Sequence, residues 1–330
     1  MNEFAVDVPV QINIWIRPEC QKAQLEVLKQ ARPSTLIIIS DGGRNDDEWR
    51  LIMENRKLIE DGINWNCTIY RLYEEENIGI VRIIEKMNEF VWSKVDRCIF
   101  LEDDTIPSVS FFRFCKELLD KYENDLRICA ICGMNHLGVY SETDNDYFFS
   151  KQGSIWGYAF WKRTYETFSD YRYEDDPYTW KLLNEAASKD KMMLRGIKER
   201  RVNKNPDAKE LYFSLTEYFM DLNMYSQNQL LIIPKKNMIY SMGASSEANG
   251  ADTLDRLPPA IRKMYLMETY ELEFPLRHPN FVIPDAEYEK KRNRIVGKNH
   301  PIISFKRKLE RGLLVLKAGD FKYLWKKMRK

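Results

Sequence analysis

Residues 97–107 read "RCIFLEDDTIP": an apolar run leads directly into three consecutive carboxylates, and a proline follows. Adjacent acids repel one another and are rarely buried without a positive partner. The stretch is therefore either a solvated turn or a place where something positively charged binds. The segments that precede it decide between these two interpretations.

The first hundred residues alternate between patterns typical of strands and patterns typical of helices. Strands are predicted at 8–16, 34–40, 65–73 and 96–104, and helices at 20–31, 46–62 and 77–94. This alternation predicts right-handed βαβ units, and so an α/β fold with a mostly parallel, Rossmann-like central sheet and flanking helices. In such sheets ligands bind beyond the carboxyl ends of the strands.

Polar side chains follow each of these four predicted strands. Arg17 follows the first, Asp41 the second, Asn77 the third, and Glu102-Asp103-Asp104 the fourth. Because the carboxyl ends of parallel strands meet at one edge of a sheet, these residues are expected to line a shared cleft. The acidic triplet is then part of a site rather than a solvated turn.

Beyond Pro107 the pattern is less regular. A helix is predicted at 108–124, capped by Ser108 or Ser110, followed by strands at 127–133 and 230–234 and a short helix at 216–229. Residues 241–253 are small and have no apolar period, which is typical of a functional loop. All six cysteines fall in the first 132 residues and are predicted to be reduced thiols, with Cys129 and Cys132 in a core strand.

Charge divides the chain into an acidic body and a basic tail. Residues 305–330 carry ten Lys and Arg against two acids, a net charge of +8, which leaves the preceding chain at about −7. Within 302–330, Phe305, Leu309, Leu313 and Leu316 share one helical face with basic residues opposite, a pattern typical of helices that lie on a membrane surface. The alternative is a terminal helix that packs on its own domain.

The sequence also limits the location and the partners. The first residues lack the pattern of a signal peptide, and no apolar run reaches the roughly 18–20 residues that span a bilayer. A cytoplasmic protein is therefore predicted, peripheral at the inner face of the membrane through 302–330. No nucleic-acid recognition module is visible, so nucleic acid is not an expected partner.

A sheet edge lined by carboxylates suits a divalent cation such as Mn²⁺ or Mg²⁺, which prefers oxygen ligands. Neither glycine-rich phosphate loop is present: no GxGxxG follows the first strand, and GxxxxGK[ST] does not occur. A metal held by a carboxylate is the natural alternative for neutralising a diphosphate. We therefore expect a nucleotide-diphosphate compound whose diphosphate is the leaving group.

Five motifs in order carry a resemblance to a known family: "IRP" after the first strand, "SDGG" after the second, "NIG" after the third, "FLEDD", and later "GSIWGYAFW". Together they resemble the GT-A glycosyltransferases, and most of all the N-acetylglucosaminyltransferase I-like group and its bacterial relatives from capsule and lipopolysaccharide loci. The resemblance covers roughly residues 8–255. It implies a GT-A domain at 1–255, with a nucleotide-binding half at 8–105 and an acceptor-side half at 106–255, and a C-terminal extension at 256–330.

The resemblance implies roles for the residues at the predicted sheet edge. Asp104, with Asp103, would hold Mn²⁺ or Mg²⁺ on the donor diphosphate, and Asp103 would also face the ribose or the donor sugar, next to Glu102 of the same acidic motif. Arg17 and Asp41 would contact the nucleotide, Asp41 at the edge of the base.

Further residues would complete the donor site. Asn77 and Arg82 would lie near the ribose and phosphates. Gly153, Trp156 and Gly157 match the loop under the donor sugar, although Trp156 could instead be an ordinary core residue.

The resemblance also implies an inverting reaction, which needs a carboxylate to accept the proton of the attacking acceptor hydroxyl. The family's acid opens a helix 16–17 residues before a proline-ended strand, and counting back from Pro234 reaches Glu217. The family usually has Asp there, and Asp221 lies one helical turn further on, so both stay candidates. Residues 241–253 match the segment that orders over bound nucleotide and excludes water.

The function that the resemblance implies is transfer of a sugar from a nucleotide-diphosphate donor, with UDP-sugars preferred, to a saccharide or lipid-linked saccharide in surface polysaccharide synthesis. One alternative is a sugar-1-phosphate nucleotidyltransferase, although that class opens with a glycine-rich loop where this chain has "RPEC". Another is an inactive relative that acts as a scaffold in a polysaccharide assembly complex, which Glu217 in place of Asp keeps open.

Overall fold

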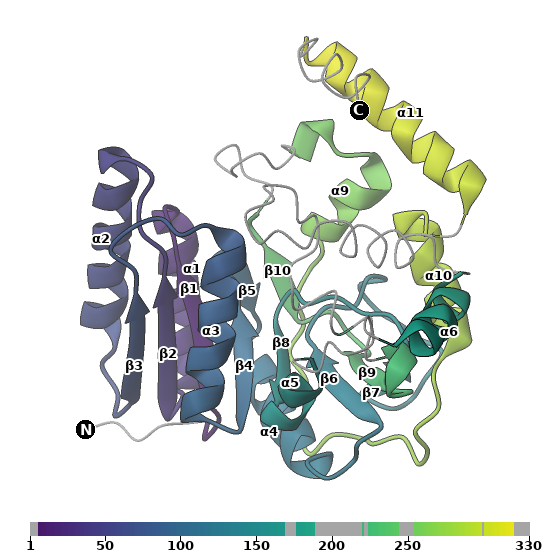
Figure 1. The fold of residues 1–330 in the computed structure, drawn as a ribbon, viewed down its shortest axis with the longest axis horizontal. Coiled ribbons are helices and arrows are strands. Elements are labelled where there is room, and N and C mark those ends of the chain that lie inside the picture. The colour runs from purple at the N-terminus through teal and green to yellow at the C-terminus, as the bar shows by residue number, and fades with distance from the viewer. Residues whose placement is uncertain are drawn as a thin grey trace.

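A computed structural model describes residues 6–168, 176–188, 220, 224–243, 254–298 and 300–319. Its central feature is an eight-stranded sheet in the order β3-β2-β1-β4-β8-β6-β9-β7, flanked by helices (Figure 1). Four of the seven adjacent pairings described are parallel and three are antiparallel. The predicted α/β class with a mostly parallel sheet is confirmed.

The first half of the chain builds the parallel part of this sheet. Its strands are β1 (Val10–Ile14), β2 (Thr35–Ser40), β3 (Thr68–Tyr73) and β4 (Arg97–Leu101), and its connecting helices are α1 (Pro18–Ala31), α2 (Asp46–Gly62) and α3 (Ile80–Lys94). After Thr35, β2 is buried throughout, as expected for a strand covered on both faces. The predicted bounds of α2 match those observed. Asn45 caps the start of this helix, because its side chain accepts from Glu48 N at 3.0 Å.

The second half continues the sheet with mixed directions. The strands are β6 (Ile128–Cys132), β7 (Tyr147–Ser150), β8 (Tyr158–Trp161) and β9 (Leu230–Pro234), and a separate antiparallel pair joins β5 (Thr105–Pro107) to β10 (Ile239–Ser241). The helices are α4 (Ser110–Lys121), α5 (Lys162–Phe168), α6 (Pro177–Ala187), α9 (Pro259–Tyr265), α10 (Ala286–Val296) and α11 (Pro301–Lys317), with a 3₁₀ turn, η2, at Leu254–Arg256.

One apolar core runs through both halves. Around β4 and β8 it contains Phe100 stacked on Tyr158 and Phe160, with ring centroids 5.1 and 5.0 Å away. Residues beyond 255 contribute to the same core, including the fully buried Tyr288 of α10. All six cysteines are free thiols, and Cys129 and Cys132 are buried in β6, as predicted.

One predicted detail is wrong and others lie outside the described residues. Neither Ser108 nor Ser110 caps α4 through its side chain; Glu271 does so instead, accepting from Val109 N at 3.0 Å and Ser110 N at 2.7 Å. The candidate bases Glu217 and Asp221, the loop residues 244–253 and the end of the tail at 320–330 are not described. Within the described residues, no helix has the length and apolar character that crossing a bilayer requires.

Candidate functional site

The strand order places a crevice at the carboxyl ends of β1 and β4. From β1 the chain moves outward to β2 and β3, and then returns through α3 to place β4 on the other side of β1. At such a switch point the connections on either side diverge, which opens a ligand site in many α/β proteins. A cavity of about 640 Å³ lies here, lined among others by Arg17, Asp41, Asn77 and the acidic triplet.

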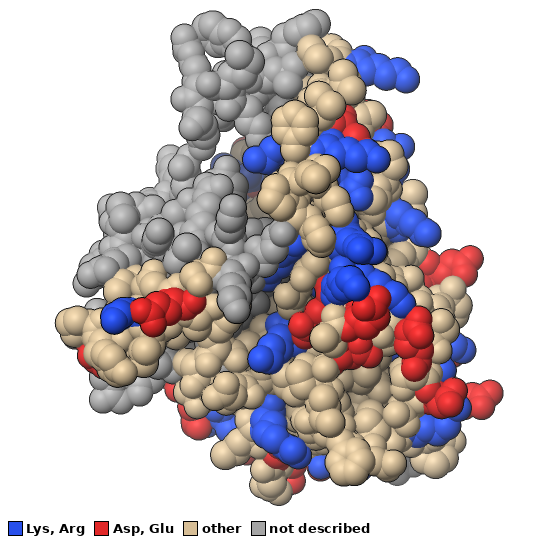
Figure 2. All heavy atoms as spheres, turned by 90° about the vertical axis from the view of Figure 1, so that its right-hand side faces the viewer, with Lys and Arg blue, Asp and Glu red and all other residues tan. Residues whose placement is uncertain are grey.

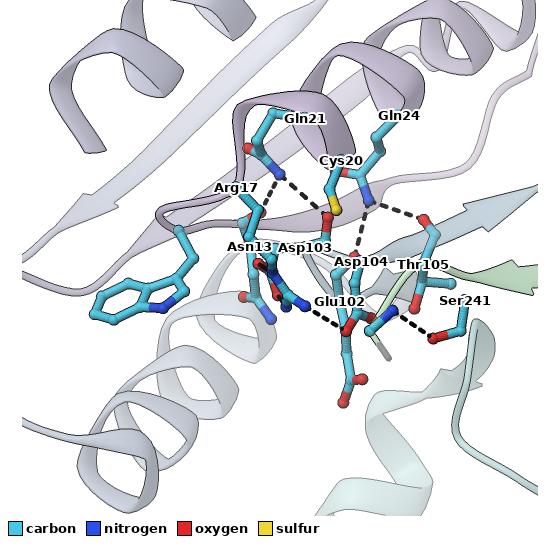
Figure 3. A network of polar contacts seen from close by, with 12 residues as sticks. Asn13, Arg17, Cys20, Gln21, Gln24, Glu102, Asp103, Asp104, Thr105 and Ser241 are labelled. Atoms are coloured by element: carbon cyan, nitrogen blue, oxygen red, sulfur yellow. Dashed lines mark hydrogen bonds and ion pairs between the residues drawn. The ribbon is translucent and has the colours of Figure 1, made fainter. Parts of the chain in front are cut away.

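The acidic triplet forms the turn between β4 and β5, and Arg17 closes over it. Nε and Nη2 of Arg17 donate to the two carboxylate oxygens of Asp103 at 2.8 and 2.6 Å, and Nη1 donates to Oδ2 of Asp104 at 3.0 Å. Figure 3 shows the guanidinium beside Asp103 and Asp104, with the side chain of Glu102 extending away from it. A positive group does accompany the acids, and the protein itself supplies it.

Two glutamines of α1 hold the backbone of this turn. Nε2 of Gln24 donates to the carbonyls of Glu102 at 2.9 Å and Thr105 at 3.1 Å, and Nε2 of Gln21 donates to the carbonyl of Asn13 at 3.1 Å (Figure 3). Both glutamines are fully buried. Nε2 of Gln21 also lies 3.5 Å from the carbonyl of Asp103, so both amides hold the backbone of the turn against α1.

The ion pair is largely withdrawn from water. The side chains of Arg17, Asp103 and Asp104 are 11%, 14% and 16% exposed. Burial raises the pKa of Asp103 above its usual value, and the hydrogen bonds and charge of Arg17 act against that rise. For Arg17, burial lowers the pKa, but the hydrogen bond and charge of Asp103 and the charge of Asp104 outweigh it and raise the pKa above its usual value.

Asp41 organises the turn that begins α3. Its Oδ1 accepts from Gly42 N at 2.8 Å and Ile78 N at 3.0 Å, and its Oδ2 accepts from Gly79 N and Asn77 Nδ2, both at 3.0 Å. Gly79 enters the helix at a φ of 82°, which favours glycine. Asp41 and Asn77 thus hold each other at the cavity wall, and the contact of Asp41 with a base stays a prediction.

Four other predicted residues are not in the cavity lining. Arg82 is exposed on α3, and Trp156 packs its ring 4.7 Å from that of Tyr265. Gly157 has a φ of 61° and its carbonyl accepts from Gly133 N at 2.8 Å, while a β-carbon on Gly153 would approach Leu231 to 2.7 Å. The two glycines allow close packing. The role of Gly153, Trp156 and Gly157 under a donor sugar stays a prediction, and so does the place of Arg82 near the ribose and phosphates.

The cavity also has residues that the sequence did not single out. Gln11, Asn13 and Trp15 occupy alternate positions along β1 and its end, and all three line the cavity. Arg44 lies 5.8 Å from the ring centre of Trp15. Because alternate residues of a strand share one face, two polar residues spaced by two in an otherwise apolar strand were the available signal.

The donor chemistry of the acidic turn fits a divalent cation. In the part of the chain that the structure describes, no group of three or more His, Cys, Asp or Glu side chains is arranged to hold a metal. Asp103 and Asp104 supply carboxylate oxygens that already hold a cationic group. Mg²⁺ typically takes one or two protein carboxylates and completes its shell with water and substrate phosphates, so two carboxylates suffice.

Comparisons with known proteins give little beyond this. No protein-family model and no curated protein matches the chain. A mannosyltransferase from Pyrobaculum calidifontis, solved with GDP-Man and Mn²⁺, is similar at a TM-score of 0.34 and 11% identity over 51% of this chain, which spans half of that protein. A UDP-glucose pyrophosphorylase solved with UDP-glucose is similar at a TM-score of 0.38 and 10% identity, over 73% of this chain and 95% of that one. The interpretation of the site therefore depends on this chain's own residues.

Proposed function

We propose that this protein is a metal-dependent glycosyltransferase that uses a nucleotide-diphosphate sugar. The observation that carries the proposal is the pair Asp103 and Asp104, which follows β4 beside the switch point, lines a cavity of about 640 Å³ and pairs with the guanidinium of Arg17. That volume lies in the range of roughly 300–1,000 Å³ found for small-molecule sites. The ordered motifs that resemble GT-A glycosyltransferases support the same conclusion.

The cavity residues form two groups with different proposed roles in donor binding. The turn of Asp41 and Asn77, with Trp15, forms the wall suited to a nucleoside, because it offers an aromatic surface and fixed polar groups. Asp103 and Asp104 form the end suited to the diphosphate, where a bound Mn²⁺ or Mg²⁺ would neutralise the charge that develops on the leaving group. UDP-sugars are the proposed donors.

The transfer step needs a base, and the two candidates for it lie outside the described residues. The acceptor hydroxyl oxygen bonds to the anomeric carbon, the bond from that carbon to the diphosphate oxygen breaks, and its electron pair leaves with the nucleoside diphosphate. The hydroxyl proton passes to a carboxylate, for which Glu217 is the first candidate and Asp221 the second. The configuration at the anomeric carbon inverts in this scheme.

The C-terminal helix suggests where the acceptor is. Ile302, Phe305, Leu309, Leu313 and Leu316 are exposed along α11 at intervals of three and four residues, and so share one face. Lys306, Lys308 and Lys317 are also exposed on this helix. Figure 2 shows basic side chains over the described upper right of the face that carries α10 and α11, with uncharged surface and a few acidic side chains between them.

An apolar face beside exposed lysines fits the surface of an anionic membrane, with the apolar residues in the acyl boundary and the ammonium groups at the headgroups. We therefore place the enzyme at the inner face of the membrane, acting on a saccharide or a lipid-linked saccharide acceptor in surface polysaccharide synthesis.

The first test is a thermal-shift screen of nucleotide sugars with and without Mn²⁺. A bound ligand raises the apparent stability by mass action, so the donor should raise the melting temperature only when metal is present. The donor found in this way is then incubated with the protein and Mn²⁺, and its hydrolysis is compared with that in Asp104→Ala and Glu217→Ala. Both variants should hydrolyse it far more slowly than the parent.

The same reagents separate the other functions. If both variants hydrolyse donor like the parent, the site assignment is wrong. Formation of a nucleoside triphosphate from donor and pyrophosphate would instead identify a nucleotidyltransferase. Binding of donor without turnover by the parent, with any acceptor tried, would identify an inactive binding protein.

A further inference from the structure

We infer that Arg17 is an internal counter-cation: it occupies the place of the divalent metal in the free protein, and it moves onto the phosphates of the donor when metal and donor bind together. This inference rests on the proposed function, because it assigns the residue that couples the two ligands of that site. It also assigns Arg17 a role beyond a contact with the nucleotide.

The oxygens that Arg17 occupies are the ones that a metal would need. Its three guanidinium nitrogens engage both oxygens of Asp103 and Oδ2 of Asp104, at 2.6 to 3.0 Å. Three of the four carboxylate oxygens accept from a guanidinium N–H, so a cation that binds both carboxylates through these oxygens must replace the hydrogen bonds of Arg17. Metal and guanidinium therefore compete for one place.

The free protein needs such a counter-cation. Asp103 and Asp104 are adjacent and mostly buried, and two like charges so placed repel strongly when nothing neutralises them. Gln21 and Gln24 fix the backbone of the turn, so the acids cannot relax by swinging the turn into solvent. Arg17 removes the repulsion without an external ligand.

The displaced guanidinium has a place to go. Arg17 is in the short segment between β1 and α1, and its side chain lines the cavity in which the diphosphate is proposed to bind. A planar guanidinium matches two phosphate oxygens as well as it matches a carboxylate. With the diphosphate present, the bonds lost to Asp103 and Asp104 are replaced; with metal alone they are not.

The consequence is cooperative binding of metal and nucleotide. Metal alone must displace Arg17 without compensation and so binds weakly, whereas metal together with a nucleoside diphosphate binds tightly. Because coupling between two ligands is reciprocal, the nucleotide must also bind more tightly in the presence of metal, by the same factor. The movement of Arg17 from the carboxylates to the phosphates accounts for part of this change in affinity.

The test is a titration of the full chain with Mn²⁺, in which the electron paramagnetic resonance signal reports unbound metal, without nucleotide and then with UDP. In Arg17→Gln, the affinity for Mn²⁺ alone should be at least about tenfold higher than in the parent, because the metal no longer has to displace the hydrogen bonds of the guanidinium to the two carboxylates. The tightening caused by UDP should shrink by a similar factor. Arg277→Gln is the matched control, because Arg277 pairs with Asp146 at 2.8 Å and is not part of the cavity lining; it should leave both values unchanged.

The opposite result is equally clear. If Arg17 only stabilises the conformation of the acidic turn, Arg17→Gln should weaken Mn²⁺ binding both with and without UDP. That result would overturn the inference. Should that variant not fold, Arg17→Lys replaces the three-point contact by a single ammonium and should show the same two changes to a smaller degree; unchanged values there overturn the inference too. The titration without nucleotide involves no sugar donor, so it can succeed even if no nucleotide sugar is bound or turned over, and the two failures are distinguishable.

Discussion

Gly243 lies against Asp104: a β-carbon added to Gly243 would stand 2.3 Å from Oδ2 of Asp104, which is the oxygen that Arg17 contacts. The neighbouring backbone is bonded in the same place, since Met242 N donates to the carbonyl of Asp104 at 2.9 Å. The pairing of β10 with β5 brings the end of β10 to the acidic turn. The loop that begins here therefore starts beside the residues proposed to hold the metal.

We expect Gly243→Ala to weaken the binding of Mn²⁺ in the presence of UDP. The added methyl group cannot fit unless the carboxylate of Asp104 moves, and off-rotamer displacement of a side chain costs about 1 kcal/mol, which corresponds to several-fold in affinity. The same Mn²⁺ titration measures it. Gly312→Ala in α11 is the control, since a β-carbon there meets nothing within 4 Å, and it should bind Mn²⁺ like the parent. Unchanged affinity in Gly243→Ala would place Asp104 outside the metal site.

We expect Asp41→Asn to lower the free energy of unfolding by about 1–3 kcal/mol, because the amide replaces one of the two oxygens that accept from Ile78 N, Gly79 N and Asn77. Urea denaturation followed by tryptophan fluorescence measures the change. Asp61→Asn near the end of α2 removes an exposed partner of Lys57 and should change the free energy by less than about 0.5 kcal/mol. Equal effects in the two variants would contradict the organising role of Asp41.

The parallel half of the fold could be predicted because each element has its own local pattern. The apolar strand at 35–40 and the helix at 46–62, which opens with acids, are both visible in single windows of sequence. In the second half, β5 and β10 have three residues each, and β7 and β8 lie in one aromatic segment. Such short strands form because distant partners pair with them, and local periodicity does not encode those partners.

The site shows the same division. The rule that ligands bind beyond the carboxyl ends of parallel strands was enough to bring Arg17, Asp41, Asn77 and the acidic triplet to one cavity. It could not show that Arg17 pairs with Asp103, 86 positions away, because side-chain pairing depends on the direction of each loop. The capping of α4 by Glu271, from a segment some 160 residues later, is invisible for the same reason.

We expect the protein to bind vesicles that contain phosphatidylglycerol and to release them at high salt, because the exposed lysines of α11 would face anionic headgroups. Phe305→Ser with Leu309→Ser removes two side chains that are 69% and 55% exposed, and should weaken binding by about tenfold for each apolar side chain that the membrane covers. Co-sedimentation with vesicles measures it.

Phe281→Ser is the matched control for this experiment, because Phe281 is 75% exposed but lies outside α11. It should bind vesicles like the parent. If the parent stays in the supernatant with anionic vesicles, the membrane proposal fails. If the parent instead forms a dimer without vesicles, and the double variant stays a monomer, the apolar face of α11 is assigned to a second copy of the chain.

The capping of α4 gives a prediction about stability alone. The carboxylate of Glu271 accepts from Val109 N and Ser110 N, and Oγ of Ser110 accepts from Leu272 N at 2.9 Å, so the two segments satisfy each other's backbone groups. Glu271→Ala should lower the free energy of unfolding by about 1 kcal/mol, because two N–H groups lose their acceptor and the positive end of the helix dipole loses a charge.

Glu271→Gln should lower this free energy less than Glu271→Ala does, because the amide still accepts one hydrogen bond but no longer carries a charge. Urea denaturation measures both variants, with Glu273→Ala, two residues along the same segment, as the control. Metal binding should be unchanged in all three, since Glu271 caps α4 at Val109 and Ser110, and neither end of this contact belongs to the cavity lining. If Glu271→Ala and Glu273→Ala are equally stable, the contact between the C-terminal segment and α4 contributes nothing to folding.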